Sequence, residues 1–165
     1  MKVTRYAVAL GSNRRGRHGS PVDEVRAALT AIGGLRAVSA VLASAPVGPS
    51  LRRYANAVAI VETSESPPEL LARLKRVERA FGRRPGQRWG ARVIDLDIVA
   101  WSGGAWRSPG LIVPHPRWRE RSFVLAPFAS IAPGWRDPVS GRTVRQLLAR
   151  LTARAPVPSR IRVGS

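Results

Sequence analysis

The sequence predicts an α+β fold of the ferredoxin-like class, in which a βαββαβ chain forms an antiparallel sheet with two helices on one face, followed by a C-terminal extension. Two observations lead to this class. Four short apolar segments are bounded by turn-favouring residues, and two other segments repeat apolar residues at helical spacing behind capping residues. Their order along the chain is strand, helix, strand, strand, helix, strand.

The four predicted strands are rich in Val, Ile, Leu and Ala. In chain order they cover residues 5–10, 35–44, 54–63 and 93–101. Gly11-Ser12-Asn13 ends the first strand and Ser102-Gly103-Gly104 ends the last, because these residue types favour turns.

The two helices between these strands are predicted from their end signals. The first begins at Ser20-Pro21, since serine can cap the free N–H groups of the first turn and proline suits the first helical position, and it stops at Gly33. The second begins at Ser66, which has Glu69 at capping-box spacing, and it stops at Gly82.

The residues after the last strand are predicted to form the C-terminal extension. It contains a short helix near 117–128 and a last helix from 143 to about 151. The Pro- and Arg-rich tail from about residue 152 is expected to be poorly ordered. With 165 residues, 44% hydrophobic content and no internal repeat or linker, the chain is predicted to be one domain, residues 1–165.

Composition excludes several classes of protein. The absence of cysteine excludes disulfides, thiol catalysis and zinc–thiolate sites. No apolar run has the length needed to span a bilayer, and the start, Met1-Lys2-Val3-Thr4-Arg5, is unlike a signal peptide. We therefore expect a cytoplasmic protein that does not enter a membrane.

The formal net charge of +18 allows two explanations. The excess attracts polyanions such as nucleic acid or nucleotide phosphates, or it reflects a solvated surface with a bias toward arginine. Lys2 and Lys75 are the only lysines among 28 basic residues, and the arginines are scattered along the chain. The scatter favours the second explanation for most of them.

Asp95 and Asp97 are the main candidates for a metal site. They lie two apart in a predicted strand, so both side chains project to one face, roughly 6.6–6.8 Å apart along the chain. The apolar residues of the other face are Ile94, Leu96 and Ile98. Oxygen ligands without His or Cys favour Mg²⁺, which takes further ligands from substrate phosphates. The alternative is a solvent-facing pair neutralised by Arg88 and Arg92.

Cationic groups surround this pair in the sequence. The loop before the strand is rich in glycine and carries Arg83, Arg84, Arg88, Trp89 and Arg92. Arginine suits phosphate oxygens, and glycines let a loop close over a ligand. His115, between two prolines, could form a second phosphate clamp with Arg119 and Arg121, although a lone histidine between prolines more often belongs to a surface turn. The alternatives are solvated loop charges and a surface turn, but the set as a whole is typical of phosphoryl transfer by a catalytic domain.

Longer motifs surround these residues. The most specific is Arg88-Trp89-Gly90-Ala91-Arg92-Val93-Ile94-Asp95-Leu96-Asp97-Ile98. The others are Ala9-Leu10-Gly11-Ser12-Asn13, Tyr54-Ala55-Asn56-Ala57, Val113-Pro114-His115-Pro116-Arg117, Glu120-Arg121-Ser122-Phe123-Val124-Leu125 and Ile131-Ala132-Pro133. Together they make the chain resemble, over nearly its whole length, the 6-hydroxymethyl-7,8-dihydropterin pyrophosphokinase family of folate biosynthesis.

The resemblance implies that the pterin hydroxymethyl oxygen attacks the β-phosphorus of ATP, pyrophosphate moves as a unit, and AMP leaves. It implies two Mg²⁺ ions held by Asp95 and Asp97, with Arg83 and Arg92 acting on the transferring group. The implied ATP-binding residues are Arg84, Trp89, Ile98, His115, Arg121, Lys75 and Glu78. The implied pterin-binding residues are Ser44, Ala45, Val47, Tyr54, Asn56 and Phe123, two of them aromatic rings that would sandwich the pterin. The family also implies a functional link to dihydropteroate synthase, which uses the product.

The sequence departs from the family pattern in three places. The second arginine after Gly82 is displaced, because Arg83-Arg84-Pro85 replaces the common Arg-x-Arg, which puts the closing motion of that loop in doubt. The usual Gln-Pro before Tyr54 is replaced by Leu51-Arg52-Arg53. The stretch after Asn13 is unusually basic.

Two other functions fit parts of the sequence. An RNA-binding module has the same order of elements and a basic charge, but the inner strands lack its aromatic-rich signature, and residues 54–63 contain only Tyr54 as an aromatic residue. A nucleotidyltransferase could use Gly11-Ser12, but it is expected to have its aspartates soon after that motif, whereas here they lie in a distant strand.

Overall fold

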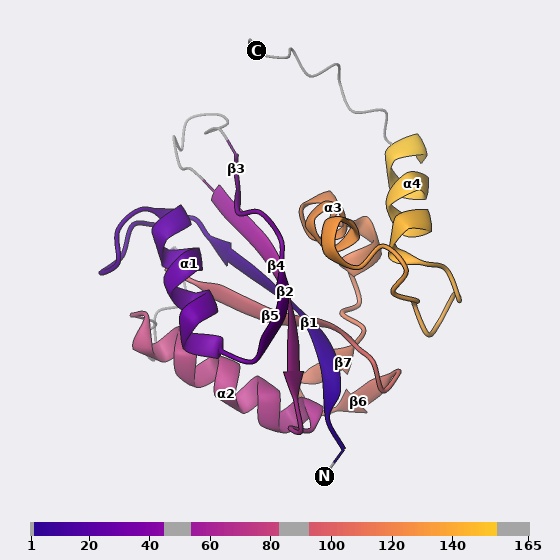
Figure 1. Cartoon of the computed structure of the whole chain (residues 1–165), viewed down its shortest axis with the longest axis horizontal. Coiled ribbons are helices and arrows are strands. Elements are labelled where there is room, and N and C mark those ends of the chain that lie inside the picture. The colour runs from indigo at the N-terminus through magenta and orange to yellow at the C-terminus, as the bar shows by residue number, and fades with distance from the viewer. Residues whose placement is uncertain (1, 45–53, 83–92, 155–165) are drawn as a thin grey trace.

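The computed structural model describes residues 2–44, 54–82 and 93–154. In this part of the chain the main sheet has five strands in the order β2-β4-β1-β5, with β3 also paired to β4 (Figure 1). The strands are β1 (Thr4–Ser12), β2 (Leu35–Val38), β3 (Leu42–Ser44), β4 (Tyr54–Thr63) and β5 (Asp95–Trp101). Every pairing is antiparallel, as predicted, and β5 lies at an edge of the described sheet.

The prediction of one strand over 35–44 is wrong, because Ser39 interrupts it. The Ser39 N–H donates to the carbonyl of Val58, and the Ser39 hydroxyl accepts the N–H of Val58, each at 2.9 Å. A side chain thus takes the place of a backbone group in the ladder and adds a bulge. The segment therefore forms two strands, β2 and β3, that pair with different parts of β4.

Helices α1 (Pro21–Ile32) and α2 (Pro67–Ala80) begin where the sequence predicts. Each has a capping box, formed by Ser20 with Asp23 in α1 and by Ser66 with Glu69 in α2. Both helices bury their apolar stripes in one core, against the β1, β4 and β5 residues of one sheet face (Figure 1). The prediction of two helices on one face holds for this pair.

The opposite face of the sheet is covered by the helical part of the C-terminal extension (Figure 1), whereas Leu111 and Val113 of the extension belong to the first core. The extension contains a hairpin of β6 (Trp106–Ser108) and β7 (Leu111–Val113), a 3-10 turn η2 (Trp118–Glu120), and helices α3 (Ser122–Ile131) and α4 (Val144–Arg154). The second core, between the sheet and η2, α3 and α4, contains Ala7, Val58, Ile60, Val99, Trp118, Leu125, Phe128 and Leu147. The sheet is therefore sandwiched between two helical layers.

Two predictions in the extension need correction. The helix predicted at 117–128 is two elements, η2 and α3, because Arg121 between them has extended backbone angles. The last helix continues through Arg154, so the expected disorder from residue 152 is wrong for 152–154; residues 155–165 lie outside the described chain. Among the helices that the structure describes, none combines the length and hydrophobicity needed to cross a bilayer.

Candidate active site

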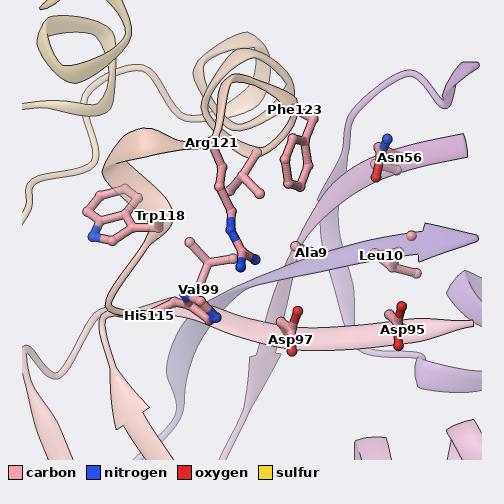
Figure 2. Close-up of a pocket in the computed structure, with 13 residues that line it drawn as sticks. Ala9, Leu10, Asn56, Asp95, Asp97, Val99, His115, Trp118, Arg121 and Phe123 are labelled. Atoms are coloured by element: carbon pink, nitrogen blue, oxygen red, sulfur yellow. The ribbon is translucent and has the colours of Figure 1, made fainter. Parts of the chain in front are cut away.

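The two aspartates lie where the alternation of the strand predicts. Ile94, Leu96 and Ile98 are at most 4% exposed and belong to the first core. Asp95 is half-buried and Asp97 is exposed on the other face of β5, where Figure 2 shows the two side chains on the same side of the strand. This part of the sequence prediction is confirmed.

The sheet surface beside the aspartates is hollow because β1 supplies small residues there. Gly11 pairs with Asp95 and Ala9 pairs with Asp97. A Cβ added to Gly11 would come within 3.2 Å of the Asn56 Oδ1 atom, so a larger residue there would crowd the Asn56 amide. The result is a cavity of about 110 Å³, roofed by α3 and walled by Asn56, Trp118, Arg121 and Phe123 (Figure 2).

A second, larger cavity lies on the outer side of β5. Its volume is about 760 Å³, and its described lining includes Lys75 of α2, Ile98 of β5 and Arg107 of the β6–β7 hairpin. Asp97 and His115 line both cavities. Two ligands could therefore bind on either side of Asp97 and meet at that residue.

His115 is held so that one ring nitrogen stays available. The His115 N–H donates to the Val99 carbonyl at 2.9 Å, and its Nδ1 atom accepts the Arg117 N–H at 3.1 Å. Burial lowers the pKa of His115, with the positive charges of Arg121 and Arg117 acting in the same direction and Asp97 opposing them. The neutral ring then carries its proton on Nε2, where it can donate to a ligand.

Arg121 and Arg119 have different environments, although the sequence paired them in one clamp. The Arg121 side chain extends from the start of α3 toward Asp97 and His115 (Figure 2). Arg119 instead binds Asp137 with two hydrogen bonds of 2.6 and 2.7 Å. The prediction that Arg119 belongs to the phosphate clamp is therefore wrong, because a buried carboxylate already engages its guanidinium.

The expected pterin-binding residues are only partly described. Asn56 and Phe123 line the smaller cavity, from β4 and α3. Tyr54 is 43% exposed and lies two residues before Asn56, on the same face of β4, but it is not part of the described cavity wall. Ser44 pairs with Tyr54 at the end of β3. Ala45 and Val47 lie outside the described residues.

Most of the expected loop residues also lie outside the described part of the chain. They are Arg83, Arg84, Arg88, Trp89 and Arg92. Their predicted roles, and the alternative in which Arg88 and Arg92 neutralise the aspartates, are therefore not tested by the geometry.

Of the two residues expected on α2, only Lys75 faces a described cavity. The Glu78 side chain is 2% exposed, and its Oε2 atom accepts the Leu96 N–H at 3.1 Å. Sequence reasoning missed Arg107 and the hairpin that carries it. The available signal was the turn-favouring pair Pro109-Gly110 followed by the apolar segment Leu111-Ile112-Val113.

The site offers two carboxylates as potential ligands for a divalent cation. No group of three or more His, Cys, Asp or Glu side chains with metal-binding geometry occurs among the described residues. Two oxygen donors beside an open cavity suit Mg²⁺, which usually keeps waters and completes its coordination with substrate phosphates. The donor set therefore fits a cation that binds together with a nucleotide.

Comparison with protein families gives a match over most of the chain. The family model described as 7,8-dihydro-6-hydroxymethylpterin-pyrophosphokinase (HPPK) matches residues 7–133. A 2-amino-4-hydroxy-6-hydroxymethyldihydropteridine pyrophosphokinase of Pseudomonas aeruginosa is 39% identical over 153 residues, which cover 89% of this chain and 91% of the relative. The enzyme of the same name from Synechocystis is 40% identical over 119 residues, which cover 71% of this chain but 61% of that protein.

Solved structures extend the similarity to the fold. The wild-type HPPK-DHPS of Plasmodium falciparum matches with a TM-score of 0.73 at 14% sequence identity, over 93% of this chain and 42% of that one. This chain therefore spans less than half of that larger protein. At this identity the likeness concerns the fold alone.

Proposed function

The chain belongs to the 7,8-dihydro-6-hydroxymethylpterin-pyrophosphokinase family, and we propose that it transfers pyrophosphate from ATP to the hydroxymethyl group of 6-hydroxymethyl-7,8-dihydropterin, releasing AMP, in folate biosynthesis. The observation that supports this most directly is the meeting of two cavities at Asp97 and His115. A two-substrate transfer needs both substrates to reach one point, and each cavity can supply one of them.

The smaller cavity is the proposed pterin site and the larger one the proposed nucleotide site. A flat ring fits against the exposed Phe123 ring, with the Asn56 amide available to hydrogen-bond its edge. Tyr54 is proposed as the second stacking ring, and Ser44, Ala45 and Val47 as the remaining pterin contacts. On the other side, Lys75 and Ile98 are proposed to contact ATP.

Asp95 and Asp97 are the proposed ligands of two Mg²⁺ ions, which would supply charge neutralisation of the ATP phosphates when bound. Their carboxylates lie on the cavity side of an otherwise core-facing strand. No other described acidic side chain completes a metal cluster there, so the phosphates would have to complete the coordination.

The remaining residues are proposed to position and neutralise the phosphates. His115 donates through Nε2, and Arg121 adds a fixed positive charge on the same side of Asp97. Such groups suffice for phosphoryl-type transfer, whose loose transition state spreads negative charge over oxygens. Arg83 and Arg92 are proposed to act on the transferring group, with Arg84 and Trp89 on the same loop binding ATP.

Three further proposals concern the topology of the fold, a functional partner and the cellular location. The strand order and antiparallel pairing support a ferredoxin-like topology with the extension as an added layer. The similarity to an HPPK-DHPS protein supports a functional link to dihydropteroate synthase. A cytoplasmic location is expected for an enzyme that uses ATP and a small soluble pterin.

The structure argues against an RNA-binding module. Such a module presents a free sheet face with exposed aromatic residues to RNA. Here the residues on that face of β1 and β4, including Ala7, Val58 and Ile60, are buried under η2, α3 and α4. The face is therefore occupied by the protein itself.

The nucleotidyltransferase alternative needs a chemical test. The sequence argued against this function because the aspartates lie far from Gly11-Ser12 in the chain. That argument fails, since Gly11 and Asp95 are paired in the sheet. The test is a reaction containing ATP, Mg²⁺ and the pterin alcohol, with products separated by chromatography. The proposed function requires AMP that forms only when pterin and Mg²⁺ are both present. Formation of ADP, or release of free pyrophosphate with an adenylated pterin, would rule it out.

A further inference from the structure

A buried carboxylate supports the strand that carries the two aspartates. Glu78 lies near the end of α2, and its side chain is 2% exposed. Its Oε2 atom accepts the N–H of Leu96 at 3.1 Å, and its Oε1 atom is 3.5 Å from the Lys75 Nζ atom. Leu96 is the residue between Asp95 and Asp97, so Glu78 binds the backbone between the two candidate cation ligands.

The hydrogen bond supplies a connection that the sheet does not. Leu96 pairs with Leu10 of β1, but its N–H points away from β1 and toward α2. On that side of β5 the described sheet has no further strand. Edge backbone groups of this kind are free to shift unless something binds them. Glu78 ties the free edge of β5 to a rigid helix, and the aspartate on each side of Leu96 shares that restraint.

We propose that Glu78 is a positioning residue. It fixes the β5 backbone relative to α2, and thereby the spacing of the Asp95 and Asp97 carboxylates for divalent cations. This proposal depends on the proposed function, which makes the aspartates the cation ligands. It also assigns Glu78 a role other than the ATP contact that the family resemblance implied. A carboxylate that is 2% exposed and bound to a backbone N–H does not face the nucleotide cavity.

Lys75 places the same helix face beside the larger cavity. It lies one turn before Glu78, lines the larger cavity, and is 45% exposed. Its ammonium group is near the Glu78 carboxylate. The helix face that borders the proposed nucleotide site therefore also carries Glu78, which binds β5. The hydrogen bond from the Leu96 N–H to Glu78 is the contact that joins α2 to β5.

Three variants of the full-length chain test the proposal. Glu78→Gln keeps an oxygen that accepts the Leu96 N–H but removes the charge. Glu78→Leu keeps the volume but removes the acceptor. Leu74→Ala is the matched control, since Leu74 is fully buried one turn earlier on α2 and its side chain has no hydrogen-bonding group.

Two readouts do not depend on turnover. Hydrogen exchange of the Leu96 amide, followed by NMR without metal, reports the anchor itself. Mn²⁺ binding in the presence of a non-hydrolysable ATP analogue, followed by electron paramagnetic resonance, reports the cation site. The third readout is kcat in the AMP-release assay, with the half-saturating Mg²⁺ concentration.

Glu78→Leu is expected to lose protection of the Leu96 amide and to weaken Mn²⁺ binding and kcat by roughly 10–100-fold, as other supporting groups around metal ligands do. Glu78→Gln is expected to stay within about threefold of the parent protein in each readout, since the hydrogen bond survives. Leu74→Ala is expected to be less stable but to bind Mn²⁺ normally.

Two results would overturn the proposal. One is a Glu78→Leu protein that binds Mn²⁺ as the Leu74→Ala control does. The other is a Glu78→Gln protein as impaired as Glu78→Leu, which would mean that the charge acts directly. If the parent protein formed no AMP, the proposed function would fail, whereas the exchange and Mn²⁺ measurements would still decide whether Glu78 supports a cation site.

Discussion

Replacing Asp137 with asparagine is expected to lower the free energy of unfolding by about 2 kcal/mol at pH 7. Asp137 is 1% exposed and accepts hydrogen bonds from Arg119, Ser140 and the Val139 N–H. Burial alone would raise the pKa of Asp137, but these hydrogen bonds outweigh it and lower the pKa from 3.8 to about 2. A carboxyl group held this far below its unfolded pKa stabilises the fold whenever it is ionised.

The pH dependence gives the prediction its sign. Because the folded pKa lies below the unfolded one, the contribution is fully present above about pH 5 and is lost as the pH falls from 3.8 through 2. At pH 3 roughly half of it should remain. Asparagine does not titrate, so the difference in stability between the two proteins should shrink over the same range.

The assay is urea unfolding followed by tryptophan fluorescence at several pH values between 7 and 3. Ser140→Ala is the matched control, since it removes one hydrogen bond to Asp137 and leaves the Arg119 pair; about 1 kcal/mol is the expected loss. A difference between Asp137→Asn and the parent protein that is equal at pH 7 and pH 3 would contradict the pKa argument. A difference well below 1 kcal/mol at pH 7 would do the same.

Four other substitutions, three in the candidate site and one in the scaffold, are expected to have different effects. Asp95→Ala and Asp97→Ala should each reduce turnover by roughly a hundredfold or more while leaving the circular dichroism spectrum unchanged; near-normal turnover in either variant would remove the metal-site assignment. Arg121→Ala should raise the KM for ATP by roughly tenfold or more, measured at saturating pterin, because a charged hydrogen-bond donor to phosphate is lost. His18→Ala should lower the urea midpoint, since the fully buried Glu24 carboxylate loses the 2.8 Å contact with the His18 Nδ1 atom; an unchanged midpoint would show that this pair adds nothing.

Strand β5, which carries Asp95 and Asp97, was the most predictable part of the fold. The sequence from Ile94 to Ile98 alternates apolar and acidic residues, and a strand has only two faces, so the side of the aspartates followed directly. The two capped helices were equally clear, because Ser20 and Ser66 each have an acidic partner three residues later. These features depend on residues that are close together in the chain.

Features that depend on distant partners could not be read in the same way. The Ser39 bulge requires Val58, and the removal of Arg119 from the phosphate clamp requires Asp137. The β6–β7 hairpin escaped because strands of three residues carry too little periodicity to recognise. In each case the local sequence allows several outcomes, and a contact made elsewhere in the fold selects one.

The position of β5 at the edge of the described sheet explains why the candidate site lies beside this strand. An edge strand leaves one row of backbone groups without a strand partner. On its inner side, the small residues of β1 hollow the surface next to the aspartates; on its outer side, α2 and the β6–β7 hairpin border the larger cavity. A strand paired on both sides would separate these two spaces, whereas an edge strand lets Asp97 contact both. An open edge therefore suits a transfer between two substrates. The hydrogen bond from Leu96 to Glu78 of α2 then restrains β5 in place of a further strand.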